Sequence, residues 1–328
     1  MDRVRDKLEQ LRQAPGDEVE EIVHDLRVAI RRCRSLAAVL QEVDASRPWP
    51  ELRRQPRKLF RALGAWRDAQ VLAGWTATLA PAEDPARTRL TELLQEQESR
   101  GRAEALRAAR KFDEVEWKQL ERIVRRRARA VPLDGPAAQC LALERLEEAR
   151  ELHARALRSN QPGPWHQLRI GLKRFRYTVE NLLPGRHAAW EDDLKRLQDL
   201  LGDLHDLDVL AELLKSEGEK IPADSAEGFR AALQRERRMR IMNYRQLTLG
   251  RTGLWHIWRR AFPSGAGLEP LASARLRATA RALDPRPRRT TSIARLGLRL
   301  FDALKKAGSS SLLRDPDIRR VFRASARL

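Results

Sequence analysis

Cysteine is nearly absent from this sequence, and its scarcity excludes two classes of protein. The two cysteines among 328 residues, Cys33 and Cys140, lie in no C-x-x-C pair and no Cys/His cluster. A disulfide framework and a zinc site of the usual ligand spacing are therefore excluded. We expect both residues to be buried thiols without a cofactor role.

Long apolar stretches are also missing. No window approaches the roughly 18 uninterrupted apolar residues that a membrane-spanning helix needs. The N-terminus, MDRVRDKLEQ, is charged from its second residue and lacks the apolar segment of a signal peptide. We therefore expect a soluble, cytoplasmic protein.

β-Branched and aromatic residues are scarce, with aromatics at 5%, and no long stretch alternates polar with apolar residues. Sheet is therefore disfavoured, while the abundant Ala, Leu, Arg and Glu favour helix. A hydrophobic content of 42% in a chain of this length is enough to bury a real core. We predict an all-α protein.

Acidic residues are too few to balance the basic ones. The chain has 65 Lys and Arg against 46 Asp and Glu, a net charge of +19. A chain so charged repels itself, which favours an anionic partner. Residues 265–328 contain 15 basic and 5 acidic groups and supply +10 of this charge, so the body combines a mixed surface with local basic stripes.

Two pairs of segments indicate an internal duplication. VHDLRVAIRRCRSLAAVL (23–40) aligns with WHQLRIGLKRFRYTVENL (165–182) at an offset of 142 residues, and LFRALGAWRDAQVLAGW (59–75) aligns with LQDLLGDLHDLDVLAEL (197–213) at an offset of 138. A period near 140 is too long for a solenoid repeat. We predict two pseudo-symmetric four-helix bundles, formed by units of about 3–130 and 137–262.

Helical periodicity and proline-rich breaks give expected helix positions in both units. They fall near 19–43, 51–79, 86–111, 114–130, 137–159, 164–183, 189–217, 225–248 and 254–262. Residues 1–264 form the predicted main domain. Residues 265–328 form a basic tail in which PSGAGLEP is a linker, DPRPRR a stiff hinge, and 290–307 and 315–327 form a small helical extension.

Each first motif places a row of cations opposite an apolar face. At 100° per residue, Arg27, Arg31 and Arg34 lie within about 80° of His24, while the apolar residues cluster on the far side. The second copy repeats the stripe with His166, Arg169, Lys173 and Arg176. Like charges at i and i+4 destabilise a helix, so a repulsion present in both copies indicates a bound anion.

The next helix of each unit adds cations before its glycine. In the first copy these are Arg54, Arg57, Lys58 and Arg61, and Lys195 and Arg196 occupy matching places in the second. If the two units pack with their motif helices side by side, all these groups line one channel. The alternative is structural, with the arginines bound to acids such as Asp68, Asp206 and Asp208.

The two histidine motifs, followed in the second copy by L-x-D-L-L-G-x-L-x-D-L-D-V (197–209), resemble the CHAD family of histidine-containing α-helical domains. The resemblance covers about residues 3–263. It implies two four-helix bundles about a pseudo-two-fold axis, no catalytic activity, no cofactor, and binding of inorganic polyphosphate in a basic groove or pore. The ligand contacts that it implies are His24, Arg27, Arg31, Arg34, His166, Arg169, Lys173, Arg176 and Tyr177.

Polyphosphate suits such a site because it carries charge without bases, so guanidinium forks can recognise it through charge-assisted hydrogen bonds. Binding should weaken with salt and strengthen toward pH 6 as histidines become charged. Association with polyphosphate granules, or with an enzyme of polyphosphate metabolism, would follow from such binding.

Two other functions compete with this interpretation. A basic helical protein could bind nucleic acid, specifically or as a weak non-specific partner, yet base recognition needs aromatics among the cations. Only Tyr177 shares a basic stripe, and six tryptophans lie among apolar residues: Trp66, Trp75, Trp117, Trp190, Trp255 and Trp258. An enzyme is disfavoured because His24-Asp25 and His205-Asp206 lack further metal ligands at usable spacing.

The tail faintly resembles the opening helices of the HD-type module attached to exopolyphosphatases and guanosine pentaphosphate phosphohydrolases. It ends before any metal-binding His-Asp pair. Two possibilities stay open: a remnant that packs or binds without hydrolysing, and basic amphipathic helices that dock on the bundle or on a partner.

Overall fold

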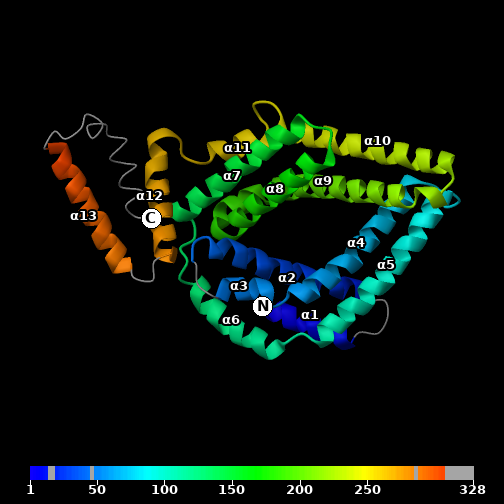
Figure 1. Ribbon diagram of the computed structural model, residues 1–328, viewed down its shortest axis with the longest axis horizontal. Coiled ribbons are helices and arrows are strands. Elements are labelled where there is room, and N and C mark those ends of the chain that lie inside the picture. The colour runs from blue at the N-terminus through cyan, green and yellow to red at the C-terminus, as the bar shows by residue number, and fades with distance from the viewer. Residues whose placement is uncertain (14–18, 45–47, 284–286, 307–328) are drawn as a thin grey trace.

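Helices arranged in two layers form the computed structural model, which describes residues 1–13, 19–44, 48–283 and 287–306 (Figure 1). No strand occurs within these ranges, which confirms the all-α class. The first layer contains α1 (Asp2–Gln13), α2 (Val19–Gln41), α3 (Pro48–Arg54), α4 (Arg57–Leu79), α5 (Pro85–Arg110) and α6 (Glu114–Ala128). The second contains α7 (Pro136–Leu157), α8 (Pro162–Leu182), α9 (Pro184–Ser216), α10 (Ala223–Thr248) and α11 (Leu254–Arg260).

Helix α5 begins where its sequence predicts a cap. The Asp84 carboxylate accepts hydrogen bonds from the backbone nitrogens of Ala86 (2.8 Å) and Arg87 (3.2 Å). Pro85 occupies the first turn, where its missing N–H costs nothing. These contacts satisfy two of the backbone donors that a helix start leaves free.

The single helix predicted over 51–79 is wrong, because the structure divides it into α3 and α4. Pro56 stands at the division. Proline lacks the N–H that a continuous helix needs, and it disfavours helical geometry in the preceding residue. The break gives α3 a direction of its own, which allows Arg53 to reach the site described below.

Two helices were not predicted from the sequence. One is α1, whose residues were described only as a charged N-terminus. The other is α12 (Leu268–Leu283), which follows a 3-10 turn at Gly265–Gly267 and contains the last three residues of the predicted linker, 263–270. Pro270 lies in the first turn of α12, where proline is compatible with helix, so it does not mark a linker. α13 (Pro287–Lys306) matches the helix predicted at 290–307, while the one predicted at 315–327 lies outside the described residues.

The internal duplication stays a prediction, and the starts of corresponding helices in the two halves of the chain are consistent with it. α2 and α8 begin at residues 19 and 162, and α5 and α10 begin at 85 and 223. Each layer contains more helices than the four expected. A two-fold relation between the layers, and the division of the chain at residue 264, stay predictions.

Apolar clusters join the layers. The main core includes leucines from α2 and from α8, and these two helices contact each other. A second cluster brings Leu90 of α5 together with Leu207 of α9 and Phe229 of α10 at the far end of both layers. Polar contacts support this junction, since Arg89 donates to Glu217 (2.8 Å).

Most of the tryptophans expected in the core are there. Trp66, Trp117, Trp190, Trp255 and Trp258 are buried, whereas Trp75 is half-buried beneath the guanidinium of Arg240. Cys33 and Cys140 are half-buried rather than fully buried, and burial raises the pKa of both thiols. Among the described residues, no helix has the length and apolar character needed to cross a membrane.

Candidate functional site

A basic cavity of about 530 Å³ lies between the two layers. α2 and α8 form two of its walls, and α3, α4 and α9 complete it. We call this space the basic cavity; its lining residues are Arg27, Arg31, Arg34, Ser35, Ala38, Arg53, Phe60, Asp68, Leu72, Arg169, Lys173, Tyr177, His205, Asp206 and Val209.

The amphipathic pattern of α2 and α8 explains how cations come to face this space. Leu26 and Ile30 of α2 and Leu168 and Leu172 of α8 are fully buried on the opposite faces of their helices. Burial of these leucines and isoleucine fixes the rotation of each helix about its axis. The arginines of α2 and the arginine and lysine of α8, on the other faces of these helices, therefore point toward one shared cavity.

The cations in the basic cavity are only partly neutralised. Arg27 forms an ion pair with Asp68 at 3.2 Å. Arg31, Arg169 and Lys173 form no ion pair with any carboxylate in the described part of the chain. The Nε atoms of Arg27 and Arg169 are also buried without a hydrogen-bond partner there, so polar groups in this cavity lack acceptors.

Burial and mutual repulsion destabilise the charged forms of these cations. Burial, reinforced by the charges of Arg169, Arg31 and Arg27, lowers the pKa of Lys173 to about 8. Burial also lowers the pKa of Arg169, despite the attraction of Asp206 and Asp68. An arginine still keeps its charge at neutral pH, so the cavity is positive and poorly compensated.

His205 and Asp206 occupy the α9 wall of the basic cavity. Burial, followed by the charge of Arg169 and then of His166, lowers the pKa of His205 to about 4. Its Nδ1 lies 3.4 Å from Nδ1 of His166. Burial raises the pKa of Asp206 to about 6, against the opposing attraction of Arg169, so this carboxylate is a poorly stabilised counter-ion.

In the structural alternative, Asp68, Asp206 and Asp208 neutralise the stripe arginines. The structure shows such an ion pair for one of these three acids. Asp68 pairs with Arg27, whereas Asp208 pairs with Arg237 of α10 at 2.8 Å. Asp206 forms no ion pair within 4.0 Å among the described residues, although its charge acts on Arg169 and Lys173. The stripe is therefore not neutralised as a whole.

The structure brings six of the thirteen candidate residues together in the basic cavity, namely Arg27, Arg31, Arg34, Arg169, Lys173 and Tyr177. His166 lies next to the cavity through its contact with His205, and Arg176 donates to Gln198 at 2.9 Å outside the lining. The other five are exposed and do not line it: His24, Arg57, Lys58, Arg61 and Lys195. The cations predicted on the second helix of each unit therefore lie farther from the basic cavity than the sequence suggested.

Sequence reasoning missed Arg53 and His205 as cavity residues. Arg53 lies beside Arg34, whose guanidinium donates to the Arg53 carbonyl oxygen and lies 5.0 Å from the centre of the Phe60 ring. Burial and the charges of Arg53 and Arg57 lower the pKa of Arg34. Pro56 was the available clue to Arg53, because a helix break there changes which residues face the stripe.

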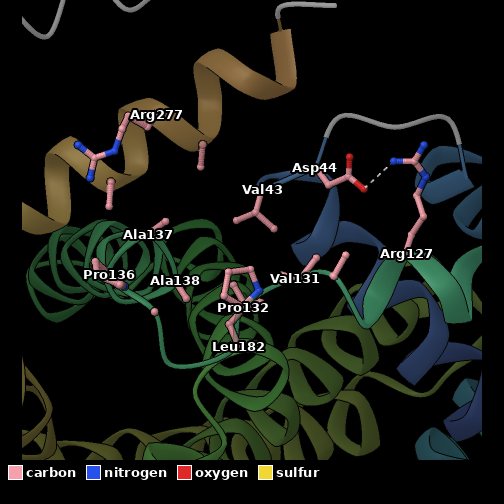
Figure 2. A pocket seen from close by; sticks show the side chains of 14 residues that line it. Val43, Asp44, Arg127, Val131, Pro132, Pro136, Ala137, Ala138, Leu182 and Arg277 are labelled. Atoms are coloured by element: carbon pink, nitrogen blue, oxygen red, sulfur yellow. Dashed lines mark ion pairs between the residues drawn. The ribbon is translucent and has the colours of Figure 1, made fainter. Parts of the chain in front are cut away.

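A second cavity of about 470 Å³ is of a different kind. It lies between the segment 130–138 and α12, and Figure 2 shows Val43, Val131, Pro132 and Leu182 around it. Its wall is mostly apolar, which does not suit an anion. Within the described residues, no group of three or more His, Cys, Asp or Glu side chains could hold a metal ion.

Comparison with known proteins identifies the family. No curated protein matches the sequence at a significant level. Among solved structures, the crystal structure of the CHAD domain from the plant Ricinus communis aligns with 81% of this chain and 86% of its own, at 23% identity and a TM-score of 0.48. The family model described as the CHAD domain matches residues 2–215, which is more than half of the chain and ends within α9. This chain therefore belongs to the CHAD domain family.

Proposed function

We propose that this protein binds inorganic polyphosphate in the basic cavity. One observation carries the proposal: Arg31 of α2 and Arg169 and Lys173 of α8 line a single cavity without carboxylate partners among the described residues. Family membership is consistent with this ligand. A string of phosphates would provide the acceptors that these donors lack.

The energetics of the cavity favour a polyanion. Half-buried cations that repel one another cost free energy, and the lowered pKa of Lys173 expresses this cost. Phosphate oxygens would offset it through charge-assisted hydrogen bonds, which are stronger than neutral ones. Arginine forks contact two oxygens at once, so the four stripe arginines that line the basic cavity suit a chain of phosphates.

The exposed candidate residues fit an outer role in the same proposal. Arg57 lies close enough to Arg34 for its charge to lower the pKa of that cavity residue. His24, Lys58, Arg61 and Lys195 are exposed, where they would attract a long anion before it enters. Such long-range attraction raises the rate of association more than the affinity.

Nucleic acid is the competing ligand, and the aromatic residues argue against it. The basic cavity contains two aromatic rings, Phe60 and Tyr177. The Phe60 ring is contacted by the Arg34 guanidinium at 5.0 Å, which leaves Tyr177 as a stacking surface. Single-strand recognition normally uses several such surfaces.

We infer a binding role without catalysis, in which the protein localises to polyphosphate granules or regulates an enzyme of polyphosphate metabolism. Incubation of the protein with long-chain polyphosphate, followed by measurement of released phosphate and of chain length, tests this part. Shortened chains would contradict it.

The double substitution Arg27→Ala with Arg169→Ala tests the site. Each removes a guanidinium from a different wall of the basic cavity, and hydrogen bonds to charged groups contribute about 1.5–3 kcal/mol each. We expect at least about a hundredfold loss of polyphosphate affinity, measured by calorimetric titration, with helix content and melting temperature retained.

A matched control removes two charges elsewhere. Arg235 and Arg238 are exposed on α10 and do not line the basic cavity. Arg235→Ala with Arg238→Ala should change the affinity by about threefold or less, because exposed charges are screened. Equal losses in the two double variants would show that overall charge, not the cavity, binds the ligand.

Competition decides between the two ligand classes. Labelled polyphosphate is bound at physiological salt and challenged with unlabelled polyphosphate, duplex DNA or single-stranded RNA of equal charge concentration. We expect only polyphosphate to compete effectively. Displacement by either nucleic acid at similar concentrations would favour the nucleic-acid function instead.

A further inference from the structure

The basic cavity continues into a neighbouring cavity of about 570 Å³, which we call the end cavity. The two share four lining residues, Ser35, Ala38, Arg53 and Tyr177. The two cavities therefore adjoin each other along α2 and α8. A ligand that fills the basic cavity and extends past Tyr177 enters the end cavity.

Helix α12 forms the wall at which this space ends. Arg275 of α12 donates to the carbonyl oxygen of Glu42 at 2.6 Å, and its guanidinium lies 3.5 Å from the carboxylate of Glu144. Glu42 follows α2 and Glu144 belongs to α7, so Arg275 connects α12 to both layers. Figure 1 shows α12 standing across this end of the molecule.

The end cavity is lined by four guanidinium groups and one carboxylate, those of Arg53, Arg145, Arg174, Arg275 and Glu42. Arg53 has no carboxylate partner among the described residues and contacts Gln41 at 3.1 Å. Glu42 is shared between Arg145 (3.1 Å) and Arg275 (3.4 Å). One partly exposed carboxylate therefore serves two arginines.

The remaining ion pairs lie beside the end cavity. Glu148 accepts from both Arg145 (2.9 Å) and Arg174 (2.8 Å). Neither Glu144 nor Glu148 lines the cavity. These acids therefore hold Arg145 and Arg174 from positions outside the lining, while all four arginine side chains line the cavity.

We propose that the end cavity is a second subsite for the anion held in the basic cavity, completed by Arg275 of α12. Glu42 is its internal counter-ion, which a phosphate displaces into solvent. The inference rests on the proposed function and extends it. α12 lies beyond residues 2–215, so this part of the site comes from outside the region that the family model matches.

A subsite in series makes affinity depend on ligand length. Tripolyphosphate is short enough to be held by the cations of the basic cavity, Arg31, Arg169 and Lys173 among them. A long chain also reaches Arg145 and Arg275. A substitution in the end cavity therefore weakens long chains selectively, whereas damage to the fold weakens both ligands.

The test is Arg275→Gln, with tripolyphosphate and long-chain polyphosphate titrated separately against the full chain. We expect long-chain affinity to fall about fivefold to tenfold, in line with the loss of a partly compensated charge-assisted contact. Tripolyphosphate affinity should stay within about twofold, because the basic cavity is intact.

Arg277→Gln is the matched control. Arg277 lies on the same helix and makes the same change of charge, but it lines the apolar cavity and is labelled there in Figure 2. It should alter neither affinity. Glu42→Gln provides a test of opposite sign, because loss of the counter-ion should raise long-chain affinity without affecting tripolyphosphate.

The outcomes separate the two proposals. If wild-type protein binds neither polyanion, the proposed function fails. If it binds both, the subsite is overturned by equal effects of Arg275→Gln on the two ligands, by no effect on either, or by unchanged long-chain binding in Glu42→Gln.

Discussion

At the residue scale, Asp206 is the unusual member of the basic cavity. It is a half-buried carboxylate among cations, yet burial raises its pKa to about 6. The charged groups that act on it or lie beside it come from three helices and are Arg169, Lys173, His166, His205, Asp203 and Asp68. Asp206 thus offsets part of the positive charge while competing with any anionic ligand.

Asp206→Asn should change polyphosphate affinity in a pH-dependent way. At about pH 8 the wild-type carboxylate is ionised and repels phosphate, so the variant should bind several-fold more tightly. As pH falls through about 6, wild-type Asp206 takes up a proton and the two affinities should converge. Calorimetric titration at several values between about pH 5 and about pH 8 measures the affinities of both proteins.

The ratio of the two affinities provides the control for that result. Any pH dependence that wild type and variant share cancels in this ratio. A constant ratio between the two proteins across the pH range would exclude Asp206 as the source of the pH dependence.

Stability should respond to the same substitution with a defined sign. The folded state holds the Asp206 proton to about pH 6, whereas the unfolded chain releases it near 3.8. Wild-type stability therefore falls as pH rises through this window. In Asp206→Asn the free energy of unfolding should be higher above about pH 6, by at most about 3 kcal/mol, and unchanged below about pH 4, as denaturant titration would show.

At the scale of elements, close packing between α4 and α5 supports the cavity wall. A Cβ atom added at Gly101 of α5 would lie 2.9 Å from the backbone nitrogen and Cα of Trp66 in α4. Backbone atoms cannot move aside as a flexible side chain can. The close approach of α4 and α5 therefore requires glycine at position 101. α4 also carries Phe60 and Asp68 of the basic cavity.

Gly101→Ala should lower the free energy of unfolding by about 1–3 kcal/mol, the usual cost of overpacking. Gly74→Ala is the matched control on α4, because nothing lies within 4 Å of its added Cβ. This control should raise stability by about 0.5–1 kcal/mol, the gain of alanine over glycine in a helix. Thermal or denaturant unfolding measures both, and stabilisation by Gly101→Ala would contradict the close approach.

α2 and α8 were the elements most accessible to prediction. Their apolar periodicity, with residues such as Leu26 and Leu168, specifies which face is buried and hence which face carries cations. Periodicity could not show that α3 separates from α4 at Pro56. Nor did it identify α12, because glycine and proline before residue 271 suggested a linker.

At the scale of the whole molecule, the contribution of the net charge of +19 to polyphosphate binding must be distinguished from the contribution of the basic cavity. Each cation that contacts a phosphate releases counterions, so binding weakens with salt in proportion to the number of contacts. By analogy with about six phosphate contacts on DNA, we expect on the order of a thousandfold loss between about 50 and about 200 mM salt.

The slope of this dependence should be smaller in Arg27→Ala with Arg169→Ala and nearly unchanged in Arg235→Ala with Arg238→Ala. The first pair of arginines lines the cavity, while the second is exposed on α10. Titration at several salt concentrations measures the slopes. Equal slopes in all three proteins would mean that the contacts lie outside the basic cavity.

The sequence by itself determined the all-α class, the basic stripes of α2 and α8, and the CHAD resemblance, because each depends on local periodicity and motif order. Only the tertiary structure decided which cations meet. It placed Arg31, Arg169 and Lys173 in one cavity, kept Lys58 and Lys195 exposed, and brought Arg53 and His205 to the wall. Cations distant in sequence come together only through the packing of helices from two layers, which no local pattern encodes.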